Sequence, residues 1–258
     1  MVRTVRATRY VTPLREGGSL PAVVEADDDG SYVLKFRGAG QGPRALIAEL
    51  VAGEIARALG LPVPEIVFMQ LDPELARTEP DAEIQDLIRA SGGLNLALDY
   101  LPGALAYDPL TMPVEPELAS RIVWFDALVG NVDRTVRNTN MLWWHGRLWL
   151  IDHGAALIFQ HQWDGFLQRS RNAFAPIAEH VLLQRATGLA AADAALQALL
   201  TPQHLADAVA LIPDTWLELD PAFVERAAQR AAYLEHFMAR LQAPRAFATQ
   251  AEQAHAGL

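Results

Sequence analysis

The stretch GNVDRTVRNTNMLWWHGRLWLIDHG, residues 130–154, is the densest polar cluster in otherwise apolar surroundings. Asp133 and Asn138 are five residues apart in a predicted loop, and Asp152 follows Asp133 by 19 residues. A loop can direct Asp133 toward a hydroxyl nucleophile and Asn138 toward a metal ion, while the chain returns with Asp152 to hold the same ion. The spacing therefore favours one site that combines two acidic side chains with an amide.

The second half of this stretch has the pattern of a β-hairpin. Two short apolar runs, residues 140–144 and 147–152, are separated by the turn-forming pair HG at 145–146. The predicted hairpin carries Asp152 at its far end. Asn140, at its start, is interpreted as a turn-stabilising residue, with a second metal ligand as the alternative.

Lys35 is the only lysine, since 20 of the 21 Lys and Arg residues are arginine. It lies in SYVLKF, residues 31–36, whose partly alternating apolar pattern predicts a half-buried strand. An arginine fork and a lysine ammonium are not interchangeable where a point charge must contact phosphate oxygens in a tight site. Phosphoryl transfer needs such a charge beside metal ligands and a residue that orients the nucleophile, so Lys35 is a candidate phosphate ligand. The alternative is a solvated strand lysine.

The first hundred residues have mainly the pattern of strands. Apolar runs at 3–11, 21–26 and 31–36, separated by turn-forming residues, predict a three-stranded antiparallel meander. Helical spacing of apolar residues then predicts one helix over 43–59. The other elements expected here are a strand over 65–72, a loop or short helix over 73–90, and a strand that begins at residue 94 and ends before the proline and glycine at 102–103.

The second half is predicted to be mainly helical. An amphipathic helix over 115–130 ends at a glycine, directly before the polar stretch. A proline-rich segment without periodicity, residues 101–115, is the expected boundary between the two halves. Further helices are expected over 177–185, 190–200, 202–210 and 221–241, followed by a frayed tail over 242–258.

Composition narrows the class of protein. The 258 residues are 51% apolar and 20% charged, which is typical of a globular chain with a sizeable core. No apolar run reaches the roughly 18 residues of a membrane span and no secretory signal is evident, so a cytoplasmic location is expected. Because cysteine is absent, disulfides and thiol nucleophiles are excluded, and the net charge of −10 argues against broad nucleic-acid binding and against docking to an acidic membrane.

Four motifs together resemble the protein-kinase-like superfamily, and most closely the HipA-like kinases and their phosphoinositide-kinase relatives. NVDRTVRN is similar to a D-R-x-x-x-N catalytic loop, LIDHG to a D-F-G metal motif and VLKF to the lysine strand. AELVAGEIARALGLPVPEI has the early glutamate and the G-x-P-V-P turn of HipA-like proteins. The resemblance implies an α+β, bilobal kinase-like fold, with a small antiparallel-sheet lobe and one helix over 1–105 and a mostly helical lobe over 106–258.

The resemblance also implies a role for each matching residue. Asp133 would orient or deprotonate the acceptor hydroxyl. Asn138 and Asp152 would ligate magnesium. Lys35 would contact the α- and β-phosphates of ATP.

Two further side chains are assigned by the same resemblance. Glu49 is the expected ion-pair partner of Lys35, and Glu54, five residues further on and on a different helix face, is the competing partner. Arg134, next to Asp133, matches the family's arginine, either as a structural partner or as a phosphate contact.

The remaining nucleotide contacts would come from backbone groups. A reduced glycine loop, EGGSLP, could cradle phosphates through backbone N–H groups, with a plain hairpin turn as the alternative. The residues of this cradle would be Gly17, Gly18 and Ser19. The adenine would lie against a hinge formed by Asp99, Tyr100 and Leu101.

Besides the reduced glycine loop, two further departures from the protein-kinase pattern affect this interpretation. The usual histidine before the catalytic arginine and aspartate is absent, and the order NVDR at 131–134 favours the HipA and lipid-kinase branch. His153 replaces the phenylalanine of D-F-G, which argues against a phenylalanine-driven switch but leaves the metal-binding aspartate in place.

The function implied is an ATP- and magnesium-dependent phosphotransferase that moves the γ-phosphate to a hydroxyl, with a protein serine or threonine favoured as acceptor. The alternatives are a pseudokinase that binds nucleotide without catalysis, and a small-molecule or lipid kinase. The expected partners are the nucleotide and the hydroxyl acceptor, without direct nucleic-acid binding or a membrane span. Residues 159–176 take the place of an activation segment, and could recognise the substrate or, as we prefer, pack against the helices.

Overall fold

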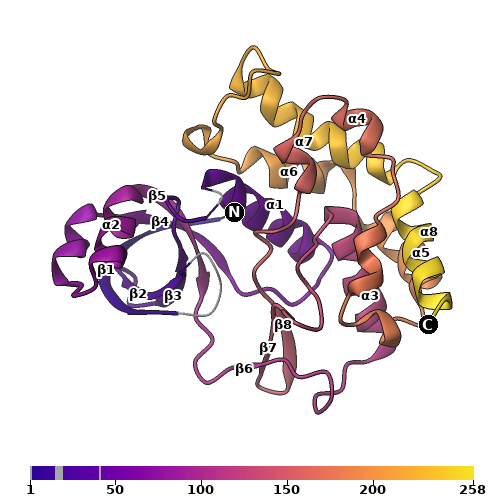
Figure 1. The fold of residues 1–258 in the computed structure, drawn as a ribbon, viewed down its shortest axis with the longest axis horizontal. Coiled ribbons are helices and arrows are strands. Elements are labelled where there is room, and N and C mark those ends of the chain that lie inside the picture. Colours follow the sequence, from indigo (N-terminus) through magenta and orange to yellow (C-terminus); the bar gives the residue numbers. More distant parts are fainter. Residues whose placement is uncertain (1, 15–19, 41) are drawn as a thin grey trace.

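The computed structural model describes residues 2–14, 20–40 and 42–258. It is a mixed α+β fold, with a small β-barrel at one side and most of the helices at the other (Figure 1). Within the described part of the chain, every helix is too short or too polar to cross a membrane.

The barrel contains five strands. The first three are β1 (Thr4–Pro13), β2 (Ala22–Ala26) and β3 (Ser31–Lys35), which form the predicted antiparallel meander. β5 (Gly93–Asp99) pairs with β3 and β4 (Ile66–Leu71) pairs with β5, both antiparallel. β4 then pairs with β1 in parallel and closes the barrel. The predicted antiparallel sheet differs from the structure at this last pair, because a helix separates β3 from β4 and returns the chain in the direction of β1.

Strand alternation decides which side chains point out of the barrel. Tyr32 and Leu34 are buried in the barrel core, so Lys35, between Leu34 and the next buried residue, lies on the outer face. Lys35 is paired in register with Leu96 of β5, which belongs to the core shared with the helices. The lysine therefore faces the helical side of the molecule.

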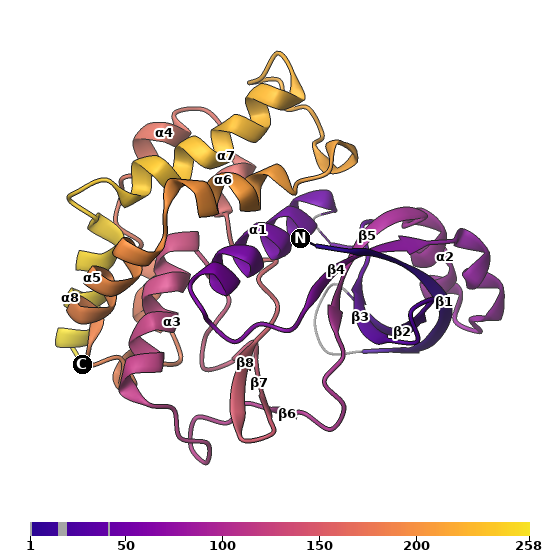
Figure 2. The ribbon, with the colours of Figure 1, turned by 180° about the vertical axis from the view of Figure 1, so that it is seen from behind.

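The helix α1 (Pro43–Ala58), predicted over 43–59, lies between the barrel and the later helices in both views (Figures 1 and 2). It is buried almost all round, from Leu46 to Ala56. A Cβ at Gly53 would stand 2.4 Å from the terminal methyl of Ile66 in β4, so glycine lets the helix lie against this strand without displacing that side chain.

The predicted long helix and hairpin are both present. α3 (Pro116–Val129) ends at Gly130, whose φ of 64° is the left-handed conformation that favours glycine at a helix end. β7 (Met141–Trp144) and β8 (Arg147–Leu150) form the hairpin, and β6 (Leu105–Ala106) adds a short edge strand. The polar stretch therefore begins at a helix end and returns through a hairpin, as its sequence indicates.

Three expectations for the helical side were wrong. The predicted helix over 177–185 is two short 3-10 turns, Ala175–Glu179 and Leu183–Arg185, because the intervening backbone hydrogen-bonds elsewhere: Val181 N donates to Arg134 O. The predicted frayed tail contains α8 (Ala246–Ala256), which packs on α3. α7 (Arg226–Leu241) begins five residues later than predicted. The remaining helices are α2 (Ala82–Ala90), the short α4 (Phe166–Arg169), α5 (Leu189–Leu199) and α6 (Pro202–Ala210).

Candidate active site

A pocket of about 230 Å³ lies where β3, α1 and the end of the hairpin meet. Its apolar walls include Ala45 and Leu46 of α1 and Phe36 after β3. The described polar residues that line it all belong to the predicted site. They are Lys35, Glu49, Asp133 and Asp152.

Lys35 forms ion pairs with two carboxylates. Its Nζ lies 2.7 Å from Asp152 Oδ1 and 3.6 Å from Glu49 Oε2, and its side chain is only 12% exposed. Burial favours the neutral amine, but the two carboxylates outweigh burial and raise the pKa of Lys35. The pocket therefore contains a permanent positive charge.

Glu49 is held at both carboxylate oxygens. Oε2 faces Lys35, and Oε1 lies 3.3 Å from Nδ1 of His153. Burial would raise the pKa of Glu49, but the Lys35 charge and the His153 contact lower it to about 2. Glu54, the competing partner, instead lies beside Arg57, so the structure places Glu49 at the lysine.

Asp133 is oriented by two asparagines. Its Oδ2 accepts a hydrogen bond from Asn138 Nδ2 at 2.8 Å and another from Asn140 Nδ2 at 3.1 Å. Its own N–H donates to Asn131 Oδ1. Within the described structure, Asp133 Oδ1 accepts no hydrogen bond, so one oxygen of this carboxylate is available to a ligand.

Asn140 makes a contact with Asp133 that was not predicted from the sequence. Its backbone has a φ of 47°, which suits the turn role that was predicted. Its side chain nonetheless reaches back to Asp133. The signal in the sequence was the pattern N-T-N at 138–140, in which both asparagines follow the loop aspartate closely.

Asp152 leaves the hairpin in an unusual conformation. Its φ is 56°, in the left-handed region that non-glycine residues seldom adopt, and its side chain is 37% exposed. The preceding residue, Ile151, donates its N–H to Asn140 O and so ties the end of the hairpin to its start. Such a backbone is typical of residues held in place for function.

Arg134 does not reach the pocket. Its guanidinium is fully buried, with Nε 2.6 Å from Asp126 Oδ2 of α3, and it also donates to the carbonyl of Asn140. Asp126 accepts two more hydrogen bonds, from His180 and Asn131. Burial would raise the pKa of Asp126, but these partners hold it far below its usual value. This arrangement favours the structural-partner alternative for Arg134 over the phosphate contact.

The residues expected to contact the nucleotide through backbone groups differ in position and in which of their N–H groups are free. Asp99 ends β5, Tyr100 and Leu101 follow it, and none of the three lines the pocket around Lys35. The N–H groups of Asp99 and Tyr100 already donate to backbone carbonyls, whereas that of Leu101 has no partner among the described residues. The predicted phosphate cradle, Gly17, Gly18 and Ser19, lies outside the described residues.

The predicted metal ligands provide the donor atoms that magnesium prefers. In the described chain, no group of three or more His, Cys, Asp or Glu side chains is arranged as a metal site. Mg²⁺, however, is usually held by one or two carboxylates together with substrate phosphates and water. The partly exposed carboxylate of Asp152 and the amide oxygen of Asn138, which accepts no bond within the described structure, fit that ligand set.

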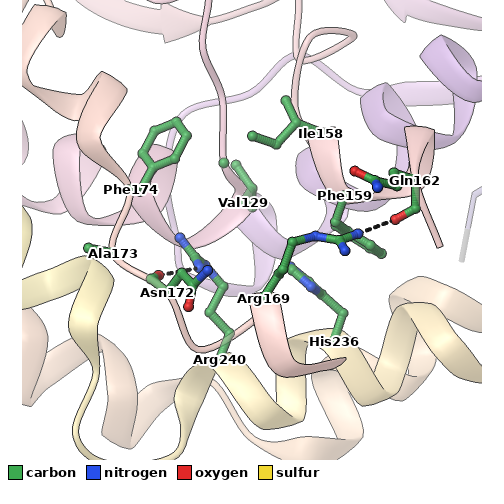
Figure 3. A pocket seen from close by; sticks show the side chains of 11 residues that line it. Val129, Ile158, Phe159, Gln162, Arg169, Asn172, Ala173, Phe174, His236 and Arg240 are labelled. Atoms are coloured by element: carbon green, nitrogen blue, oxygen red, sulfur yellow. Dashed lines mark hydrogen bonds between the residues drawn. The ribbon is translucent and has the colours of Figure 1, made fainter. Parts of the chain in front are cut away.

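A second cavity, of about 320 Å³, lies between the end of α3, residues 158–174 and α7. Arg169 and Arg240 line it and reach the backbone oxygens of Gln162 and Asn172 (Figure 3). Arg240 is buried and also donates to Ala127 O, 2.6 Å away, at the end of α3. Through these hydrogen bonds to backbone carbonyls, Arg240 of α7 connects the segment after Asp152 to the end of α3.

The fold and the pocket define a protein-kinase-like class: a β-barrel with a buried lysine, a helix glutamate paired with it, and two aspartates that converge from a loop and a hairpin. The chain matches the HipA-like kinase family over residues 8–249 and belongs to that family. No curated protein sequence matches the chain significantly.

Solved structures share the fold at low sequence identity. The Helicobacter pylori proinflammatory kinase CtkA has a TM-score of 0.58 and 13% identity, over 100% of this chain and 99% of that chain. The Golgi casein kinase with Mn and ADP bound has a TM-score of 0.51 and 14% identity, over 98% of this chain and 74% of that chain. Family and fold together support a kinase-type phosphotransferase.

Proposed function

We propose that the protein is an ATP- and magnesium-dependent phosphotransferase that moves the γ-phosphate of ATP to a hydroxyl group. The observation that carries this proposal is the meeting of Lys35, Glu49, Asp133 and Asp152 in one pocket. Phosphoryl transfer relies on positioning and on neutralising charge, and these four side chains provide a fixed cation, its anchor, a base and a metal ligand.

Each residue has one task in the proposed mechanism. Lys35 binds the α- and β-phosphates as a point charge, and Glu49 keeps it in place. Asp133, whose Oδ2 is fixed by two amides, directs its free Oδ1 at the acceptor hydroxyl and accepts the proton as the oxygen attacks. The geometry thus separates phosphate binding from activation of the nucleophile.

Magnesium, when bound, would neutralise charge on the phosphates. Asp152 and Asn138 would hold it through one carboxylate and one amide oxygen. Asp152 Oδ1 now contacts Lys35, so the ion would bind Oδ2 or replace the lysine at Oδ1. Lysine binding and metal binding would therefore be coupled through the carboxylate of Asp152.

The proposal extends to the organisation of the chain. Residues 1–105 would form the lobe that covers the nucleotide, and residues 106–258 the lobe that carries the catalytic loop. The N–H of Leu101, which has no partner among the described residues, would bind the adenine at the hinge between them. The chain belongs to the HipA-like kinase family, and we propose a serine or threonine of a protein as its acceptor.

The test is ATP turnover and ATP binding by the purified protein, with magnesium or with a chelator. Wild type should release γ-phosphate or phosphorylate itself only with magnesium, and Asp152→Ala should abolish this while leaving the fold intact by circular dichroism. Thermal stabilisation by ATP that persists with chelator, without turnover on long incubation, would establish the non-catalytic alternative instead.

A further inference from the structure

We propose that His153 is a positioning residue, whose Nδ1–H holds the carboxylate of Glu49 so that Lys35 is presented to the phosphates. This proposal rests on the proposed function. It assigns a task to the histidine that stands where a D-F-G motif has phenylalanine. The histidine makes a hydrogen bond where phenylalanine would make only a packing contact.

His153 is completely buried between α1 and α3. Its Nδ1 lies 3.3 Å from Glu49 Oε1, and its ring meets Phe125 of α3 edge-on, with the centroids 5.7 Å apart. No other hydrogen bond of the ring is present in the described chain, since Nε2 is buried without a partner. Among the residues that the structure describes, the only polar interaction of this side chain is therefore its contact with Glu49.

The tautomer of His153 follows from its partner. An ionised carboxylate can only accept hydrogen bonds, so Nδ1 must carry the proton that Glu49 accepts. A neutral ring then has a bare nitrogen at Nε2, which is the atom without a partner. The ring thus donates to Glu49 and to nothing else in the described structure.

The buried Nε2 has an energetic cost. A buried polar atom without a hydrogen bond destabilises the fold, whereas phenylalanine would fill a similar space beside Phe125 without this cost. A hydrogen bond to a charged group is one of the interactions strong enough to offset such a cost. The contact with Glu49 is therefore the physical gain that histidine offers at this position.

The contacts of the two Glu49 oxygens show how the hydrogen bond from His153 would position Lys35. Oε1 is held by His153 while Oε2 faces Lys35, so the carboxylate is fixed at both ends. Lys35 has a second partner in Asp152, the proposed magnesium ligand, only 2.7 Å away. A Glu49 released from His153 would compete less well for Lys35, which would then stay on Asp152 and obstruct the metal ligand.

Two substitutions distinguish a positioning role of His153 from a role in packing alone. His153→Phe preserves an aromatic ring but removes the donor, whereas His153→Asn is smaller but keeps an N–H near the place of Nδ1. We expect kcat with Mg-ATP to fall on the order of tenfold or more in His153→Phe, with a melting temperature equal to or above that of wild type. We expect His153→Asn to retain more turnover than His153→Phe although it is less stable.

A role in packing alone predicts the reverse order, because the better-packed variant would then be the more active. Wild-type kcat in His153→Phe, or equal loss in both folded variants, would overturn the proposal. In a Glu49→Gln background, His153→Phe should add little further loss, since the histidine acts through Glu49. A full additional loss in that background would also overturn it.

A measurement independent of activity distinguishes this proposal from the proposed function. Nitrogen-15 NMR of the imidazole should show a protonated Nδ1 and a bare Nε2 in wild type, and this pattern should change in Glu49→Gln. The opposite tautomer would overturn the proposal whatever the turnover. Absence of turnover in wild type together with the expected tautomer would instead contradict the proposed function while the contact itself stands.

Discussion

Lys35 Nζ and Asp152 Oδ1 lie 2.7 Å apart although 117 positions separate the two residues in the chain. The outer face of β3 supplies the lysine, and the turn after β8 supplies the aspartate. Since the lysine side chain is only 12% exposed, the space around its ammonium is limited outside the pocket. The contact therefore joins the barrel to the end of the hairpin at the point where phosphates are proposed to bind.

Lys35→Arg should strongly reduce turnover with the fold intact. A guanidinium is planar and broader than an ammonium, so it cannot meet Glu49 and Asp152 as one point charge in this space. We expect kcat/KM for Mg-ATP to fall by at least about tenfold, measured by phosphate release, with an unchanged circular dichroism spectrum.

The matched control is the reverse exchange at an exposed ion pair. Arg9→Lys, at the pair that Arg9 forms with Glu25 on the barrel surface, should leave turnover unchanged. Full activity in Lys35→Arg would show that Lys35 is not the phosphate ligand.

Asn140→Gly should lower kcat more than it changes the KM for ATP. Glycine accepts the φ of 47° at this position, so the change removes the hydrogen bond to Asp133 without backbone strain. Asp133 would then be oriented by Asn138 alone, and its free oxygen would point less accurately at the hydroxyl. Steady-state kinetics with varied ATP separate the two constants.

His145→Gly is the control for this prediction, because His145 also has a positive φ, of 48°, but lies exposed in the hairpin turn. It should leave kcat unchanged. An Asn140→Gly enzyme as active as His145→Gly would limit Asn140 to the turn role that its sequence position suggests.

The sequence predicts well those elements that depend on local patterns. Apolar periodicity and end signals identify α1, α3 and the hairpin, and turn residues identify the first three strands. The spacing of Asp133 and Asp152, with the single lysine, also brings together residues that the structure places in one pocket. The predictions of helices, hairpin and strands are confirmed because each rests on a few adjacent residues, whereas the roles of the pocket residues stay predictions.

The missed features depend on contacts between distant parts of the chain. The parallel pairing of β1 with β4 closes the barrel across more than sixty residues, which no local pattern encodes. Residues 177–185 have a helical composition, but the imidazole of His180 binds Asp126 and the backbone of Val181 binds Arg134, so tertiary bonds replace a helix. The pattern N-T-N at 138–140 hints at the contact of Asn140 with Asp133, but only the folded loop shows that both asparagines reach the aspartate.

Asp126→Asn should destabilise the protein by about 3 kcal/mol, because it leaves the buried guanidinium of Arg134 without its counter-charge. The pKa of Asp126 in the folded state lies far below its ordinary value of 3.8, so its charge stabilises the fold above that value. The difference in unfolding free energy between wild type and variant should be constant above about pH 5 and shrink as the pH falls below 3.8. Urea unfolding from pH 7 to pH 3 measures it.

An exposed aspartate provides the comparison. Asp86, paired with Arg89 on the surface of α2, is 79% exposed, and Asp86→Asn should change stability far less. A difference between wild type and Asp126→Asn that grows at low pH would contradict the assignment of a stabilising carboxylate at Asp126.

Phe247→Ala should be among the most destabilising substitutions near the end of the chain. Phe247 is 1% exposed in α8, meets Trp124 of α3 edge-on with the centroids 5.4 Å apart, and lies under the guanidinium of Arg240. Truncation to alanine leaves a cavity at this junction and should cost about 3–5 kcal/mol.

Leu258, 74% exposed at the end of the chain, gives the matched control, since Leu258→Ala should leave the urea midpoint unchanged. Because Arg240 also binds the backbone of α3 and of residues 170–172, loss of Phe247 should loosen the packing behind the proposed catalytic loop, so turnover should fall with stability. Equal urea midpoints for Phe247→Ala and Leu258→Ala would mean that the last helix is not docked on α3 in solution.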